Sequence, residues 1–155
     1  MLDNSLGKKA EKKIKEWLDR PEEGYCIDRL NDQMTGFYGS KNICDFTFFK
    51  SPYLYYIESK ATWEDRFDFS SISDFQFDNL LMKSQIDAVY GIVIVLFASH
   101  KRAFIFNIQD IHKAKQEEIK SVNIKKIEKW SISYKEISTV ESRKELLDYE
   151  GELLV

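Results

Sequence analysis

The segment GIVIVLFAS, residues 91–99, restricts the fold more than any other feature because it is almost continuously apolar and rich in β-branched residues. Such a run is typical of a strand covered on both faces, whereas a strand with one solvated face alternates apolar and polar residues. The polar residues 100–102 follow it, and then the apolar run AFIFNI, residues 103–108. We therefore expect a central strand with an antiparallel neighbour, inside an α/β fold.

The remaining patterns predict the helices and strands around this centre. Helical spacing in residues 6–18 aligns one apolar stripe, made of Leu6, Ala10, Ile14, Trp17 and Leu18. Further helices are expected after the N-cap Ser73, over residues 108–120 and near residues 142–147, and strands over residues 43–49, 53–61 and near 130–134. Residues 25–30 are ambiguous, and residues 31–42 are expected to form a loop or irregular hairpin. The predicted architecture is a mixed β-sheet flanked by helices.

Composition limits the class of protein. A chain of 155 residues with 43% hydrophobic residues is expected to fold as one domain, residues 1–155. A net charge of −3 gives no general attraction to polyanions, so a nucleic-acid partner would need a local basic patch. Two cysteines without CxxC spacing, the absence of a recognisable leader and the short apolar run 88–98 predict a soluble, cytoplasmic protein.

The hairpin of residues 42–62 carries the candidate chemistry. If its turn is centred between Ser51 and Pro52, opposite residues have numbers that sum to 103, and Asp45 faces Glu58. Opposed residues have Cβ atoms ~4.5–5.5 Å apart, so two like charges there repel each other. A divalent cation such as Mg²⁺ would offset that repulsion. Strand alternation places Lys60 on the same face as Glu58.

Two carboxylates, a cation and a nearby lysine are suited to phosphodiester hydrolysis. The cation would lower the pKa of a bound water and clamp the phosphate, while Lys60 would orient the nucleophile or neutralise developing charge. The alternative interpretation is that Asp45, Glu58 and Lys60 are ordinary exposed residues of an amphipathic hairpin.

The arrangement Asp45…Glu58-x-Lys60 resembles the PD-(D/E)xK nuclease motif, and the wider pattern resembles the RecU-type Holliday junction resolvases. The resemblance covers residues 7–111, and it includes Gly7 with Glu11, Phe67 with Gln76, and the Gly91-Ile92 strand start. It implies a restriction-endonuclease-like core, Mg²⁺ or Mn²⁺ dependence, a homodimer and four-way DNA junctions as substrate. The family's long junction-binding stalk is represented here only by residues 31–42, and the polar residues usual before the acid are replaced by Ile43 and Cys44.

The resemblance also implies roles for individual residues. Asp45 and Glu58 would be metal ligands, to which we add Ser59, and Lys60 would be the catalytic lysine with Glu11 and Gln76 in support. An ordinary ion pair between Glu11 and Lys15, one helical turn away, is the alternative for Glu11. The candidate nucleic-acid-binding residues are Lys8, Lys12, Lys15 and Arg66, although a solvated helix face would also explain the lysines.

The sequence therefore predicts a metal-dependent DNA endonuclease that resolves branched DNA. Two alternatives stay open. One is another nuclease of the same fold, of restriction, repair or nicking type. The other is a DNA-binding or partner-binding module that has kept the fold and lost catalysis.

Overall fold

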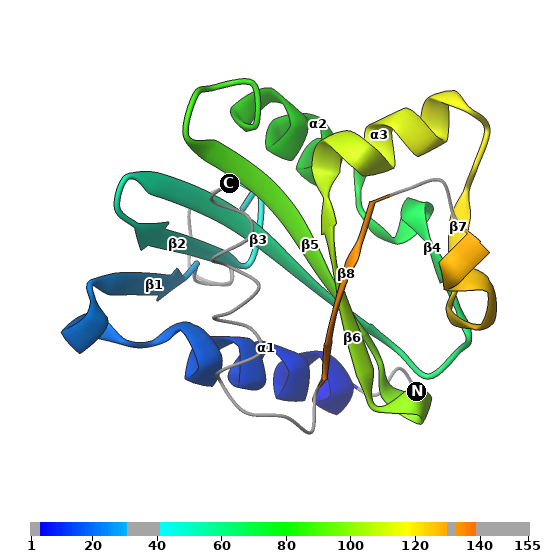
Figure 1. Cartoon of the computed structure of the whole chain (residues 1–155), viewed down its shortest axis with the longest axis horizontal. Coiled ribbons are helices and arrows are strands. Elements are labelled where there is room, and N and C mark those ends of the chain that lie inside the picture. The colour runs from blue at the N-terminus through cyan, green and yellow to red at the C-terminus, as the bar shows by residue number, and fades with distance from the viewer. Residues whose placement is uncertain (1–3, 31–40, 130–132, 139–155) are drawn as a thin grey trace.

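A computed structural model describes residues 4–30, 41–129 and 133–138, and it is built around a six-stranded mixed sheet (Figure 1). The strands of this sheet, in spatial order, are β1 (Tyr25–Arg29), β2 (Phe46–Lys50), β3 (Tyr53–Thr62), β5 (Val89–Phe97), β6 (Arg102–Asn107) and β8 (Lys135–Ser138). Strands β3 and β5 are parallel, and every other neighbouring pair is antiparallel. The predicted mixed sheet and the antiparallel partner of the central strand are confirmed.

Helices cover both faces of this sheet. Helix α1 (Asn4–Leu18) lies on one face, and α2 (Asp74–Lys83) and α3 (Ile108–Gln116) lie on the other (Figure 1). A small second sheet pairs β4 (Arg66–Asp68) with β7 (Ser121–Asn123). Short 3₁₀ turns occupy Pro21–Glu23, Phe69–Ser71, Ala98–His100 and Ile124–Lys129.

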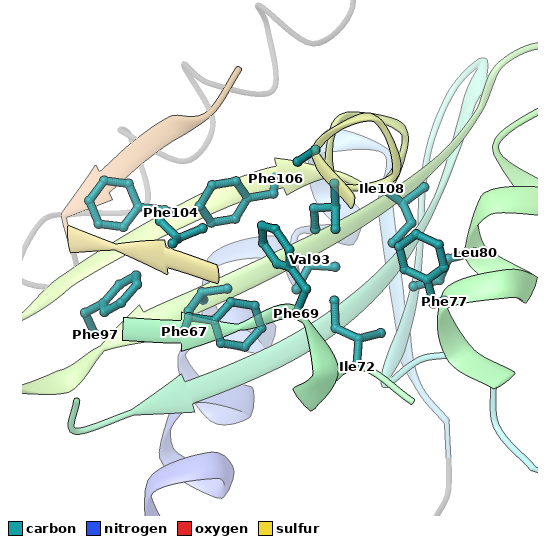
Figure 2. Packing of buried hydrophobic residues seen from close by; sticks show 14 of the residues in the cluster. Phe67, Phe69, Ile72, Phe77, Leu80, Val93, Phe97, Phe104, Phe106 and Ile108 are labelled. Carbon is teal, nitrogen blue, oxygen red and sulfur yellow. The ribbon is translucent and has the colours of Figure 1, made fainter. Parts of the chain in front are cut away.

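The central strand β5 is apolar along its length because it contributes to two cores. Ile92 and Ile94 pack toward α1, in a cluster that includes Ile14, Phe48 and Tyr55. On the opposite face Val93, Val95 and Phe97 join a second cluster with α2, α3, β4 and β7. Figure 2 shows this second core, in which the rings of Phe67, Phe69, Phe97, Phe104 and Phe106 belong to the same cluster as Val93 and extend along the sheet. A strand without a solvated face has no position for a polar side chain.

Gly91 marks the closest approach of α2 to the sheet. A Cβ built on Gly91 would lie 2.9 Å from the backbone oxygen of Leu80 and 3.0 Å from Cγ2 of Ile108. Real side chains almost never make contacts this short, so any other residue would push the helix away from the strand. The glycine therefore sets the distance between α2 and β5.

The hairpin register is the one that the turn predicted, up to the edge of the candidate site. Lys50 pairs with Tyr53 and Phe46 with Ile57, so partner numbers sum to 103. The paired residues end there, one step before the expected pair of Asp45 and Glu58, because the backbone N–H of Asp45 donates to the oxygen of Ile57. Strand β2 consequently begins at Phe46, and the predicted start at residue 43 is wrong. Asp45 instead lies at a bend where its side chain can turn.

Other boundaries differ from the predictions. The ambiguous residues 25–30 contain strand β1, and the small sheet of β4 and β7 was not predicted, since both strands are short. Strand β8 is Lys135–Ser138, and α3 ends at Gln116. Residues 31–40 of the predicted loop, residues 130–132 of the strand predicted near 130–134, the helix near 142–147 and the Trp17 side chain lie outside the described residues. None of the helices in the described ranges has the length and apolar content needed to cross a membrane.

Candidate active site

Glu58 is the buried acid of the site, with 3% of its surface exposed. It lies in the middle of β3, where the amide Nε2 of Gln76 donates to its Oε2 at 2.8 Å and the ammonium of Lys60 lies 3.7 Å from its Oε1. Burial and then the nearby Asp45 carboxylate raise the pKa of Glu58 to about 9, against a smaller lowering effect of Lys60. Without a further cation, Glu58 is therefore protonated at neutral pH, and its contact with Lys60 is not a full ion pair.

Asp45 reaches the same place from the bend before β2. Its Oδ2 accepts a hydrogen bond from the backbone N–H of Ser59 at 2.8 Å, which fixes the carboxylate beside the residue that follows Glu58. A hydrogen bond between the Asp45 and Glu58 side chains is among the causes that raise the pKa of Glu58. The two acids therefore meet through their side chains, although their backbones are not partners in the strand ladder.

Arg29, at the end of β1, links a third acid, Glu11, to the pair of Asp45 and Glu58. Its Nε and Nη2 donate to the two carboxylate oxygens of Glu11 on α1 at 3.1 and 3.2 Å. Its Nη2 lies 3.9 Å from Oδ1 of Asp45, and its Nη1 donates to the backbone oxygen of Leu30. Arginine suits this position because its planar fork binds a carboxylate at two points. The guanidinium therefore holds Glu11 next to Asp45 and offsets part of the negative charge.

Sequence reasoning missed Arg29. Its partner Glu11 was expected either near the metal or paired with Lys15, and the structure places it against Arg29, 18 positions away along the chain. The sequence offered only a weak indication that Arg29 belongs to the site, because it is a single arginine near the end of the ambiguous segment 25–30. The contact depends on α1 crossing the end of β1, which local patterns do not reveal.

Gln76 lies in the first turn of α2, and this position places its side chain in the site. Ser73 caps this helix, and its hydroxyl accepts from the backbone N–H of Gln76 at 3.2 Å, as expected for an N-cap. The cap fixes the start of the helix, and the amide of Gln76 then points at Glu58. An amide donor can serve either the protonated or the ionised carboxyl, so Gln76 holds the orientation of Glu58 in both states.

Lys60 and Ser59 point in different directions from β3. The side chain of Lys60 is on the face of Glu58 and is 24% exposed, so a substrate can reach it. Ser59 alternates to the other face, where it lines a narrow space with Ala10 and Lys13 of α1. Its hydroxyl is buried and lacks a hydrogen-bond partner in the described part of the chain. The backbone carbonyl is therefore the group of Ser59 that remains for a metal.

The donor set fits a hard divalent cation with few protein ligands. Among the described residues there is no group of three or more His, Cys, Asp or Glu side chains arranged to hold a metal. Asp45 and Glu58 supply two carboxylates, however, and Mg²⁺ commonly uses one or two carboxylates and fills its other positions with water and phosphate oxygens. The raised pKa of Glu58 indicates that Lys60 alone does not neutralise the pair. A cation would complete that neutralisation.

The neighbouring cysteine offers no competing nucleophile. Cys44 directly precedes Asp45 and is buried, with its thiol donating to the backbone oxygen of Phe46 at 3.2 Å. Burial and then the charge of Glu58 raise the pKa of the Cys44 thiol to about 12. A thiol that stays protonated at neutral pH is a poor nucleophile and a poor metal ligand.

The predicted DNA-binding residues fall in two places. Lys8, Lys12 and Lys15 are exposed on α1, the helix that carries Glu11 and packs against β3. Arg66 is exposed on β4, and its Nε lies 2.9 Å from Oδ1 of Asp68. The structure therefore joins Asp45, Glu58, Lys60, Gln76 and, through Arg29, Glu11 in one site, while the lysines lie on the adjoining helix and Arg66 on another strand.

Comparisons with known proteins give little beyond the fold. No family model matches the chain, and no curated protein matches it. Among solved structures it is similar to that of Archaeoglobus fulgidus Hjc, a Holliday junction resolvase from an archaeal hyperthermophile, with 17% sequence identity and a TM-score of 0.49. The match covers 67% of this chain and 78% of that chain.

Proposed function

We propose that the chain is a metal-dependent DNA endonuclease that resolves four-way junctions. The observation that carries the proposal is the meeting of Asp45 and Glu58 beside Lys60. Burying one acid against another is costly, and the cost is recovered when a divalent cation binds both. Such a pair, next to a lysine within reach of solvent, suits phosphodiester hydrolysis better than any other chemistry available at this site.

Each residue of the site has a distinct task in this proposal. Asp45 and Glu58 would hold Mg²⁺ or Mn²⁺, with the Ser59 carbonyl as a further ligand. The ion, when bound, supplies an acidified water and neutralises charge on the scissile phosphate. Lys60 donates toward the attacking water or the phosphate oxygen, where negative charge increases in the transition state.

The other residues position these groups. Gln76 keeps Glu58 facing Asp45, and Arg29 keeps Glu11 near the acids without adding its full charge to them. Glu58 gives up its proton as the cation binds, because the cation favours the ionised carboxylate. The Ser59 N–H holds Asp45 in the same orientation throughout.

The proposal that DNA junctions are the substrate rests on the charge distribution and on the resemblance of the sequence to the RecU-type resolvases. The overall charge of the chain is −3, so phosphate contacts must come from local groups, and the exposed lysines of α1, the helix that carries Glu11, are one such set. A junction resolvase cuts two strands at symmetric positions, which favours an isologous homodimer. Light scattering should then give about twice the chain mass of 18.3 kDa. A monomer that nicks junctions in symmetric pairs would contradict the dimer.

The decisive experiment compares Asp45→Asn with Lys60→Ala. Asparagine keeps the shape and can still accept from Ser59 N–H, so without metal Asp45→Asn should melt no lower than wild type. The rise in melting temperature with Mn²⁺ and the cleavage of a labelled four-way junction should both vanish. Lys60→Ala should keep most of the Mn²⁺ shift and lose cleavage, because the lysine is not a ligand. Full retention of both readouts in Asp45→Asn would refute the site.

The two alternatives give different results in the same assay. Junction, flap, duplex and single-stranded DNA should be tested side by side with Mg²⁺ and with Mn²⁺. Preferential cutting of duplex or flap DNA would indicate another nuclease of this fold. Binding of DNA without cleavage under any condition would favour the non-catalytic module.

A further inference from the structure

Trp63 is exposed at the end of the strand that carries the candidate site. It follows directly after β3, and 56% of its surface is accessible, which makes it one of the most exposed large apolar side chains of the described residues. Most other aromatic side chains of the described residues pack in or against the two cores, as Phe48 and Phe104 do. An exposed indole at the end of this strand presents a flat aromatic face to which a nucleic-acid base could bind.

The turn that carries Trp63 is fastened to the rest of the molecule. The hydroxyl of Ser99 donates to the backbone oxygen of Trp63 at 2.6 Å, and the N–H of Glu64 donates to the hydroxyl of Thr62 at 3.0 Å. Two residues on, the backbone oxygen of Asp65 accepts from the N–H of Ile124 at 2.8 Å. The indole is thus presented on a backbone that is held on both sides.

The carboxylate of Asp65 connects the same turn to the segments that carry His100 and Lys125. It contacts the ring nitrogen Nε2 of His100 at 2.6 Å and the ammonium of Lys125 at 3.0 Å. These contacts lower the pKa of Asp65, first through the hydrogen bond to His100 and then through that to Lys125. A fixed turn loses little conformational entropy when a partner binds to it, so the indole is preorganised.

The backbone of Trp63 continues the strand that carries the reacting groups. Trp63 is three residues beyond Lys60 and five beyond Glu58, so at ~3.3 Å per residue its Cα is at most about 10 Å from that of Lys60 and about 17 Å from that of Glu58. Bases along one DNA strand are spaced by about 3.4 Å, so these distances span about three to five nucleotides. Exposed cations lie beside the turn at Arg66 and Lys125, whereas Glu64 is acidic. Both cations are already paired with a carboxylate, Arg66 with Asp68 and Lys125 with Asp65, so the indole face is the group that this turn offers to DNA.

We propose that Trp63 is a stacking platform for an unpaired base of the DNA, within about five nucleotides of the scissile phosphate. This inference rests on the proposed function, and it adds that the site requires a base to leave the duplex stack. Aromatic side chains stack on any base, whatever its identity, because every base has a π-face. Fully paired DNA keeps its bases stacked on one another, so it offers no base to Trp63. Trp63 would therefore favour branched, gapped or single-stranded DNA over perfect duplex.

Binding without cleavage tests the platform. Two labelled probes are used in EDTA, a single-stranded 12-mer and a duplex with a short single-stranded gap. Each probe is titrated with wild type, Trp63→Ala and Trp63→Phe, and fluorescence anisotropy measures binding. Stacking energies correspond to about 5- to 140-fold in affinity, so Trp63→Ala should weaken binding to both probes within that range. Trp63→Phe should recover part of the loss. Binding to a fully paired duplex should change less than about twofold.

Phe49→Ala is the matched control. Phe49 is also an exposed aromatic residue, at 44%, but it lies on β2 near the opposite end of the hairpin from Asp45. Its removal should leave binding of all three probes unchanged. Circular dichroism and thermal melts establish that each variant is folded.

A direct readout does not depend on the alanine variant. In a Trp17→Phe, Trp130→Phe background, Trp63 is the single tryptophan of the chain. The single-stranded 12-mer should quench its fluorescence, and the paired duplex should not. Equal quenching by both probes, or none, would overturn the platform, as would Trp63→Ala with wild-type affinity for the gapped DNA.

The test also separates this inference from the function on which it rests. If wild type cleaves DNA and Trp63→Ala binds and cleaves as well as wild type, the platform is wrong and the nuclease stands. If no DNA is cleaved but single strands quench Trp63, base stacking by Trp63 stands as a property of a non-catalytic DNA-binding module, and the nuclease is wrong. A loss of dimer mass in Trp63→Ala with unchanged DNA affinity would instead assign Trp63 to a contact between two copies, which overturns the inference.

Discussion

Replacing Glu58 with Gln should change how the stability of the metal-free protein depends on pH. The pKa of Glu58 is raised from 4.5 to about 9 in the folded protein, mainly by burial and by Asp45. An acid with a raised pKa in the folded state binds more protons there than in the unfolded chain between those two values. Its contribution is therefore complete below about pH 4.5 and is lost as pH rises toward 9. The metal-free protein should become less stable across this window.

The size of this loss follows from the shift. One unit of pKa corresponds to about 1.4 kcal/mol, so the shift from 4.5 to about 9 corresponds to an upper bound of about 6 kcal/mol. That bound is comparable with the whole stability of a small domain, ~5–15 kcal/mol, so even a third of it is measurable. The substitution Glu58→Gln cannot ionise, and its side-chain oxygen can still accept the hydrogen bond from Gln76. The variant should therefore gain on wild type as pH rises.

Urea unfolding in EDTA at each unit from pH 5 to pH 9 measures this effect. The difference in unfolding free energy between Glu58→Gln and wild type is the quantity of interest, because pH effects that do not involve Glu58 cancel in it. This difference should be near zero at pH 5 and should reach several kcal/mol in favour of the variant by pH 9. A difference that stays flat, or that favours wild type at high pH, would refute the buried acid pair.

Calorimetry adds a second test of the same pair. Mg²⁺ or Mn²⁺ binding at pH 7 should release close to one proton from wild type, seen as a dependence of the binding heat on the ionisation enthalpy of the buffer. Because the cation displaces the proton of Glu58, the affinity for metal should rise with pH up to about 9. Metal binding that is independent of buffer and pH would mean that Glu58 is not a ligand.

Three further predictions concern packing, positioning and charge. Gly91→Ala should destabilise the fold by about 1–3 kcal/mol, because its Cβ would lie 2.9 Å from the Leu80 oxygen, whereas Gly7→Ala, with nothing within 4 Å, should be neutral or stabilising in thermal melts. Arg29→Lys should lower kcat about tenfold with a smaller effect on KM, since lysine cannot bind both oxygens of Glu11; an unchanged kcat would remove Arg29 from the site. Replacing the α1 lysines Lys8, Lys12 and Lys15 together by Gln should flatten the salt dependence of duplex binding by up to about 0.9 for each phosphate that these lysines neutralise. An unchanged slope, as expected for the control Lys113→Gln on α3, would return them to a solvated surface.

Local patterns in the sequence were enough for the features that depend on neighbours along the chain. The period of apolar residues was sufficient for α1 and for the central strand β5, because burial on one face or on two leaves different patterns. The register of β2 and β3 followed from counting outward from Pro52, since a tight turn leaves few ways to pair the strands that it joins. Alternation then put Lys60 on the side of Glu58. The core of the candidate site, with Asp45, Glu58 and Lys60, is local in this sense.

The support of these groups depends on packing between distant segments, which local patterns do not contain. Arg29 meets Glu11, and Gln76 meets Glu58, in each case across 18 positions of chain, because α1 and α2 pack against different faces of the sheet. The burial of Glu58, and with it the raised pKa, depends on the same packing. The departure of Asp45 from the ladder is a detail of the hairpin itself, in which its N–H donates to the oxygen of Ile57, and residue counting did not reveal it. The period of apolar residues indicates which face of a helix or strand is buried, but it does not indicate which distant element packs against that face. The chemistry of this site depends on that packing.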